Sequence, residues 1–116
     1  MEARRKELTS RYRERKITGG VYLLKNTQGG KSLLEATTDM RGSKNRFDFS
    51  QKTNSCANLK LQQDWEKYGA GAFTFEVLEE HVKSESQTMK EFEADIAVLK
   101  ELWFEKFSGE KAVIGS

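Results

Sequence analysis

Three segments of the chain carry patterns of apolar residues that are typical of β-strands. Val21 to Leu24 is a β-branched and aromatic run that follows paired glycines, and an apolar run resumes from Lys31 to Thr37. Between them, Asn26 to Gly30 has the composition of a turn, so the two segments predict an antiparallel hairpin. Phe73 to Val77 places apolar residues at every second position, which predicts a third strand with one buried face.

Apolar residues at steps of three and four predict two helices in the second half of the chain. The first begins at about Ser55, and Gly69 is expected to end it as a C-terminal cap. The second is a long amphipathic helix, for which Ser84 and Gln87 have the spacing of an N-terminal capping box. The apolar positions are Leu61, Trp65 and Tyr68 in the first helix and Met89, Phe92, Ile96, Leu99, Trp103 and Phe107 in the second.

The remaining segments carry weaker patterns. Residues 1–16 favour a short helix by propensity. Asp39 to Asn54 is polar, basic and irregular, and is expected to be mostly loop with a short extended piece at Phe47 and Phe49. A sheet this small must be covered by helices, so the chain is predicted to be an α+β domain, a three-stranded antiparallel sheet flanked by helices.

The length and the charge distribution limit how the chain is organised. Its 116 residues suit one domain. We expect that domain at residues 17–107, after a basic N-terminal helical segment (1–16) and before a flexible tail (108–116). The formal net charge is only +2, but residues 1–16 hold seven Lys or Arg against three Glu, whereas residues 79–116 hold nine acidic residues against five basic ones. Nucleic-acid binding would therefore require a local basic patch.

Neither a membrane nor a metal is indicated by the composition. The chain has no run of about 18 apolar residues, and its N-terminus is charged where a signal peptide would be apolar, so we expect a cytoplasmic protein without membrane contact. Cys56 is the one cysteine and His81 the one histidine, which excludes an intramolecular disulfide and offers no zinc-ligand set. Cys56 is expected to be a small buried apolar residue, and His81 to cap a strand or face solvent.

Four stretches of sequence stand in an order and spacing that point to a known family. Gly20-Val21-Tyr22 opens the first predicted strand, Leu33-Leu34-Glu35 follows about ten residues later, Asn58 to Glu79 contains a helix, a turn and the third strand, and Leu99 to Phe107 lies in the final helix. Together they resemble the GIY-YIG nuclease superfamily, particularly its small stand-alone bacterial proteins, over roughly residues 17–107. The position of the first tripeptide relative to the longer stretch carries the resemblance.

The resemblance implies a hydrolytic site built from four groups. These are a tyrosine from each tripeptide, an arginine in the next helix and a metal-binding glutamate in the last helix. Phosphodiester hydrolysis needs a base for the attacking water, a cation for the phosphorane and a metal ion for the leaving oxygen. Tyr22 matches the first tyrosine, although it would suit packing in a strand equally well. Leu33 replaces the second tyrosine, and Glu35 replaces the glycine and brings a negative charge to where a phosphate would approach.

The arginine and the glutamate are altered as well. Without gaps the family arginine aligns with Ser43, whereas a short insertion would let Arg46 take its place, and Arg41 is a weaker substitute. Lys100 occupies the position of the metal-binding glutamate, and its neighbour Glu101 points about 100° away around the helix. The resemblance therefore predicts a nuclease-like domain with a degenerate site. The catalytic positions are Tyr22 and Arg46, and the vestigial ones are Leu33, Glu35, Ser43 and Lys100.

The charge pattern leaves three functional hypotheses open. The first is nucleic-acid binding with little or no cleavage, through basic residues interleaved with Phe47 and Phe49; the simpler alternative is a solvated charged surface over two core phenylalanines. The second is a surviving endonuclease, and only this hypothesis needs a cofactor, Mg²⁺ or Mn²⁺. The third is a protein-interaction or structural module that docks through the last helix or the N-terminal helix. The expected nucleic-acid contacts are Arg41, Lys44, Arg46, Lys52 and Asn58.

Overall fold

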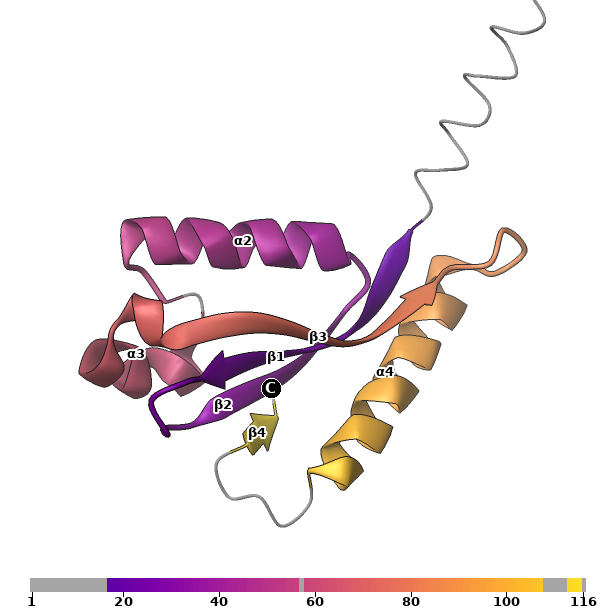
Figure 1. The fold of residues 1–116 in the computed structure, drawn as a ribbon. Coiled ribbons are helices and arrows are strands. Elements are labelled where there is room, and N and C mark those ends of the chain that lie inside the picture. Colours follow the sequence, from indigo (N-terminus) through magenta and orange to yellow (C-terminus); the bar gives the residue numbers. More distant parts are fainter. Residues whose placement is uncertain (1–16, 57, 108–112, 116) are drawn as a thin grey trace, which may run out of the picture.

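The computed structural model describes residues 17–56, 58–107 and 113–115. Its centre is a four-stranded mixed sheet with the strand order β3-β1-β2-β4 (Figure 1). The strands are β1 (Thr18–Asn26), β2 (Ser32–Thr37), β3 (Phe73–Val82) and β4 (Val113–Gly115). The predicted hairpin and third strand are confirmed, and so is the α+β class. The expectation of a purely antiparallel, three-stranded sheet is wrong, because β4 pairs in parallel with β2.

Two of the predictions concern the ends of the chain. The helix expected at residues 1–16 lies outside the described residues. The expected flexible tail contains β4, where Val113 pairs with Ser32 and Ile114 with Leu33. Three residues are too few to show a period of two, so the sequence pattern gave no sign of this strand.

The register of the central strands decides which side chains are neighbours at the middle of the sheet. Tyr22 pairs with Glu35 across β1 and β2, and with Val77 across β1 and β3. Leu24 pairs with Leu33 in the same hairpin. Successive side chains on a strand point to opposite faces, so Tyr22 and Leu24 share one face. The first motif tyrosine and the glutamate that replaces the motif glycine are therefore direct cross-strand neighbours.

The segment predicted to be mostly loop is a helix, α2 (Met40–Thr53). Asp39 caps its N-terminus by accepting a hydrogen bond from the backbone N–H of Gly42, and Asn54 ends it in the left-handed region with a φ of +54°. Its buried residues are Met40, Ser43, Phe47 and Ser50. These positions follow the helical spacing, but two of the four are serine. The apolar period that would have indicated a helix is therefore absent.

Helices cover both faces of the sheet, with α2 and α3 on one side and α4 on the other (Figure 1). α3 (Gln62–Tyr68) follows a 3₁₀ turn at Leu59–Leu61, so the first predicted helix begins later than Ser55. Its end at Gly69 is confirmed, where φ is +86°. The core on this side consists of Leu33, Phe47, Leu61, Trp65, Ala72 and Phe73.

The long C-terminal helix is confirmed as α4 (Met89–Lys106), but its predicted cap is wrong. Thr88 and Glu91 form the capping box, whereas Ser84 and Gln87 are hydrogen-bonded to each other in the preceding turn. The core on this side contains Val21, Leu23 and Leu34, with Leu78, Leu99, Trp103, Phe107 and Val113 packed against them. Among the described residues, no helix is both long enough and apolar enough to cross a membrane.

Candidate functional site

A cavity of about 350 Å³ lies where β1 and β2 meet α2 and the segment leading into α3. The sequence analysis singled out five residues that the structure brings together in its wall. They are Tyr22, Glu35, Ser43, Arg46 and Asn58. The other lining residues are Leu24, Phe47, Ser50, Cys56, Leu61 and Trp65. Tyr22 and Glu35 are neighbours through the register of β1 and β2. Ser43 and Arg46 lie one turn apart on α2, and Asn58 lies in the turn before α3.

The carboxylate of Glu35 is held by two hydrogen bonds. The hydroxyl of Tyr22 donates to Oε2 at 2.8 Å, and the side-chain amide of Asn58 donates to Oε1 at 2.8 Å. Asn58 is fixed in turn, because its Oδ1 accepts from the backbone N–H of Lys60 at 2.9 Å. The ring of Tyr22 is buried and stacks on Phe75 with a centroid distance of 4.4 Å. The Tyr22 hydroxyl is therefore already used as a donor within the protein.

The same surroundings keep Tyr22 protonated. Burial raises the pKa of the Tyr22 hydroxyl well above its ordinary value, and the negative charge of Glu35 and the hydrogen bond to it raise it further. The polar side chain of Ser43 and the positive charge of Arg46 lower the pKa without cancelling these effects. A phenol in this environment is a poor base for activating water near neutral pH.

Ser43 and Arg46 share the place where the family arginine is expected. Ser43 is buried, and its Oγ donates to Oγ1 of Thr37 at 2.8 Å. Arg46 lies one turn further along α2, and its Nη2 donates to the same Ser43 Oγ at 3.0 Å. The guanidinium group of Arg46 therefore lies next to Ser43, the position with which the family arginine aligns. Arg46 itself is exposed and able to contact an anion at the mouth of the cavity.

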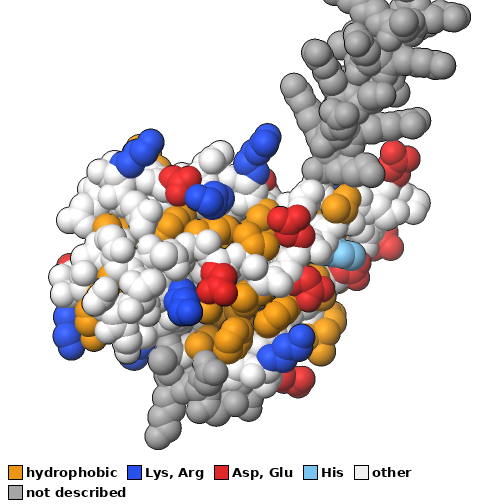
Figure 2. Space-filling view, in the orientation of Figure 1, with side chains coloured by type: hydrophobic (Ala, Val, Ile, Leu, Met, Phe, Trp, Pro, Cys, Tyr) orange, Lys and Arg blue, Asp and Glu red, His pale blue; other side chains and the backbone are white. Residues whose placement is uncertain are grey.

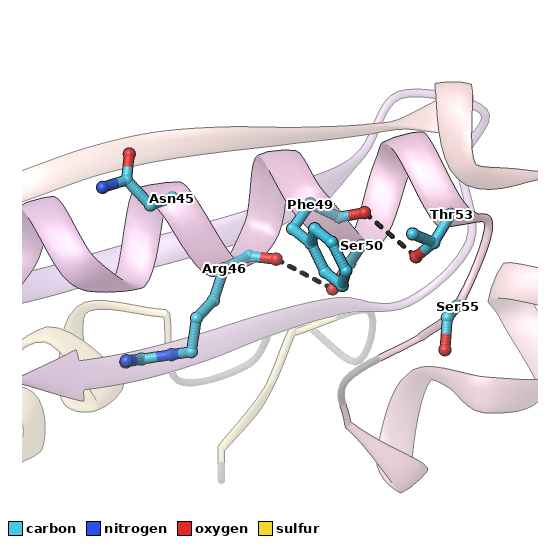
Figure 3. Close-up of a pocket in the computed structure, with 6 residues that line it drawn as sticks. All are labelled: Asn45, Arg46, Phe49, Ser50, Thr53 and Ser55. Carbon is cyan, nitrogen blue, oxygen red and sulfur yellow. Dashed lines mark hydrogen bonds between the residues drawn. The ribbon is translucent and has the colours of Figure 1, made fainter.

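A second, more open hollow of about 410 Å³ lies along α2, and Figure 3 shows the residues that line it. Arg46 and Ser50 line both hollows, so the two are adjacent. Ser50 is tied to the helix by donating to the carbonyl oxygen of Arg46 at 2.9 Å. Phe49 projects into the second hollow with 66% of its surface exposed, whereas Phe47 is buried. The extended piece predicted at these two residues is wrong, and only Phe49 is free to stack on a base.

The other predicted basic residues lie on the exposed side of α2 and not on a loop. Figure 2 shows Lys and Arg side chains spread over this part of the surface, with acidic groups among them. Arg41, Lys44 and Lys52 are all exposed. Lys44 forms an ion pair with Asp48 at 3.0 Å, which reduces its net contribution to a positive patch. The basic character of α2 therefore rests mainly on Arg41, Arg46 and Lys52.

Two of the vestigial positions lie outside the cavity. Leu33 is fully buried in the core, next to Phe47. Lys100 lines a different hollow, between α4 and the end of β2, together with Thr37. Within the described residues, Glu35 is the one carboxylate that lines the cavity, and both of its oxygens already accept hydrogen bonds. This donor set does not fit the divalent cation that the resemblance implies.

Three polar groups in the cavity wall, those of Ser50, Cys56 and Trp65, were not among the predicted site residues. Cys56, expected to be a buried apolar residue, is half-buried; its thiol donates to the carbonyl oxygen of Asn58 at 3.1 Å, and burial raises its pKa. Trp65 is 4% exposed, and its Nε1–H has no acceptor among the described residues. The shared face of Leu61 and Trp65 was visible in the sequence, but only the position of α3 shows that this face borders the cavity.

His81 belongs to the opposite side of the sheet. Its ring stacks on Phe92 with a centroid distance of 5.7 Å, and its Nε2 lies 3.5 Å from a carboxylate oxygen of Asp95. The partly exposed imidazole thus joins β3 to α4. These contacts give it a packing role away from the cavity.

No family model matches the sequence, and no curated protein matches it. The structure is similar to that of the catalytic domain of the homing endonuclease I-TevI, with a TM-score of 0.53 and 18% sequence identity. The superposed region covers 84% of this chain and 96% of that domain. The chain therefore has a GIY-YIG-like fold.

Proposed function

We propose that this chain is a nuclease-like domain that binds nucleic acid and hydrolyses it very slowly or not at all. The GIY-YIG-like fold supports the nucleic-acid part of the proposal. The hydrogen bond from Tyr22 to Glu35 carries the other part. In this bond the hydroxyl of Tyr22, the one motif tyrosine that is retained, donates to Glu35, which replaces the glycine of the family motif.

Three requirements of phosphodiester hydrolysis are poorly met in the cavity. The Tyr22 hydroxyl has a raised pKa and a partner, so it is a weak base. The Glu35 carboxylate repels a phosphate, and among the described residues it is the one carboxylate in the cavity wall, which is too few ligands for a metal ion. Removing one such group from a hydrolytic site typically lowers the rate by about a hundredfold or more. Arg46 alone does not offset losses of this size.

A nicking assay tests the inactive part of the proposal. We expect no conversion of supercoiled to open-circular plasmid above the buffer background, with Mg²⁺ or with Mn²⁺. Tyr22→Phe removes the hydroxyl and keeps the stacking on Phe75, so it should match the wild type. Metal-dependent nicking that Tyr22→Phe abolishes would instead establish an active endonuclease. That alternative is favoured by one observation, the presence of Tyr22 and Arg46 in the same cavity wall.

A salt titration tests the binding part. Arg41 and Lys52 are exposed on α2. Removing a positive side chain that contacts a phosphate weakens binding and makes the affinity less dependent on salt. For Arg41→Gln/Lys52→Gln we expect the affinity for a labelled DNA to fall about tenfold or more. The slope of log K against log salt should become less steep by roughly two. Fluorescence anisotropy at several salt concentrations measures both quantities.

A matched control separates a specific patch from total charge. Lys25→Gln/Lys90→Gln also removes two positive charges, from exposed positions outside α2 at the end of β1 and the start of α4. It should change the affinity for DNA by less than about threefold if α2 is the contact surface. Equal losses in the two double variants would show unspecific attraction. Salt-independent behaviour of the wild type would favour the protein-interaction alternative, for which the half-exposed Val98 and Leu102 of α4 are the candidate contacts.

A further inference from the structure

The cavity beneath α2 has the size and lining of a site for a small aromatic molecule. Its volume of about 350 Å³ falls within the range of about 300–1,000 Å³ that is usual for ligand pockets. Tyr22, Phe47 and Trp65 provide aromatic surface in its wall. Glu35 and Asn58 provide polar groups beside them. Aromatic walls combined with a few fixed polar groups are the usual means of holding a nucleobase outside its stack.

Glu35 is arranged to accept further hydrogen bonds. Tyr22 donates to one carboxylate oxygen and Asn58 to the other, so the orientation of the carboxylate is fixed before any ligand arrives. Each oxygen of an ionised carboxylate has two lone-pair sites, and each is left with one. Glu35 is only partly buried, which leaves it accessible from the cavity. The carboxylate therefore presents two adjacent acceptors in a fixed plane.

Trp65 adds aromatic surface to the cavity wall. Its side chain lines the cavity and is 4% exposed, and its Nε1 is itself covered by surrounding atoms. The polar groups that a ligand meets in the cavity are therefore those of Glu35 and Asn58, beside an aromatic wall.

We infer that this cavity holds one unstacked guanine base of a single-stranded nucleic acid. Guanine presents two adjacent N–H donors, N1–H and the exocyclic amino group, together with the acceptors O6 and N7. Adenine and cytosine pair one amino donor with an adjacent ring acceptor, and thymine offers one N–H between two carbonyl oxygens. Neither pattern matches two fixed carboxylate oxygens. The inference rests on the proposed nucleic-acid binding and specifies what its central cavity reads.

The surroundings of the cavity suit a strand that continues past the bound base. Arg46 lies at the junction of the two hollows, where its guanidinium can contact the backbone phosphate of the bound nucleotide. Phe49 projects into the second hollow, where a neighbouring base can stack on its exposed ring (Figure 3). A duplex would keep its bases paired and out of reach, so a single strand is the expected partner.

Binding of matched oligonucleotides tests the inference. We expect an oligo(dT) strand with one central dG to bind the wild type about tenfold more tightly than the same strand with a central dA. Glu35→Gln should remove this preference, so that the dG and dA strands bind with equal affinity. Thermal unfolding of each variant verifies that it is folded under the assay conditions.

Two controls make the outcome specific. Glu76→Gln removes one negative charge from an exposed position of β3 outside the cavity, and should keep the full preference for dG. Competition with dGMP and dAMP shows whether the protein binds a nucleic-acid strand or a free nucleotide. The inference requires the dG strand to bind much more tightly than dGMP, and equal affinity for both would overturn it.

The remaining outcomes separate this inference from the proposed function. Salt-sensitive binding of both strands with no preference for dG would overturn the guanine site and leave nucleic-acid binding intact. A dG preference that survives in Glu35→Gln would also overturn it. If no strand binds at all, both proposals fail.

Discussion

Gly20→Ala should lower the free energy of unfolding by about 3 kcal/mol or more, although it adds only one methyl group. Gly20 has a φ of +147°, which L-residues with a side chain rarely adopt. A Cβ there would lie 1.9 Å from the carbonyl oxygen of Glu79, a backbone atom of β3 that cannot rotate away. Urea denaturation followed by circular dichroism measures the change. The reason for the loss is the close approach of β1 and β3.

Gly71→Ala is the matched control for this substitution. Gly71 is exposed, its φ is not in the left-handed region, and its added Cβ would meet no described atom within 4 Å. Its effect should stay within about 0.5 kcal/mol. A small effect at both glycines would contradict the close approach of β1 and β3. A large effect at Gly20 alone would show that the first glycine of the motif is needed for the sheet whether or not the site performs chemistry.

Elements with a strong apolar period could be predicted from the sequence. The hairpin appears as apolar runs because both of its faces are covered, whereas β3 alternates and α4 has a helical apolar period because each is only partly buried. Phe73, which follows a turn and begins the alternation of β3, and Ile96, in the middle of α4, are both buried as expected. The capping box was misplaced because Ser84 to Gln87 and Thr88 to Glu91 have the same spacing, and only the helix start distinguishes them.

α2 could not be recognised because its buried face is partly polar. Ser43 and Ser50 occupy the positions where an ordinary amphipathic helix has apolar residues. Both hydroxyls are satisfied, Ser43 by donating to Thr37 and Ser50 by donating to the carbonyl oxygen of Arg46. Two buried serines beside the cavity are tolerated because their hydrogen bonds are made locally. The same feature that hid the helix thus belongs to the candidate site.

The candidate site was only partly accessible to sequence reasoning. The resemblance named Tyr22, Glu35 and Arg46, and the structure places all three in one cavity wall. The hydrogen bond between Tyr22 and Glu35 depends on hairpin register, which a turn of uncertain length leaves open. The position of Trp65 depends on how α3 packs, which no local pattern contains. The hydrogen bond and the position of Trp65 are therefore known from the tertiary structure and could not be read from residue identities.

Phe92→Ala should lower the free energy of unfolding by about 3–5 kcal/mol. Phe92 is fully buried near the start of α4, and its ring stacks on His81 of β3. It also lies against β1, because a Cβ added at Gly19 would be 3.1 Å from its Cζ. Truncation would leave a cavity between α4 and the sheet and remove the contact that fixes the first turns of the helix.

Phe104→Ala, on the same helix, serves as the control because Phe104 is 46% exposed. We expect it to cost less than about 1 kcal/mol, measured by the same urea denaturation. Comparable losses at both positions would contradict the packing of α4 described above. Phe92 lies on the face opposite the cavity, so at a temperature where Phe92→Ala remains folded its affinity for a dG-containing strand should equal that of the wild type. A loss of affinity in the folded variant would mean that the two faces of the sheet are energetically coupled, and that α4 contributes to binding through the sheet.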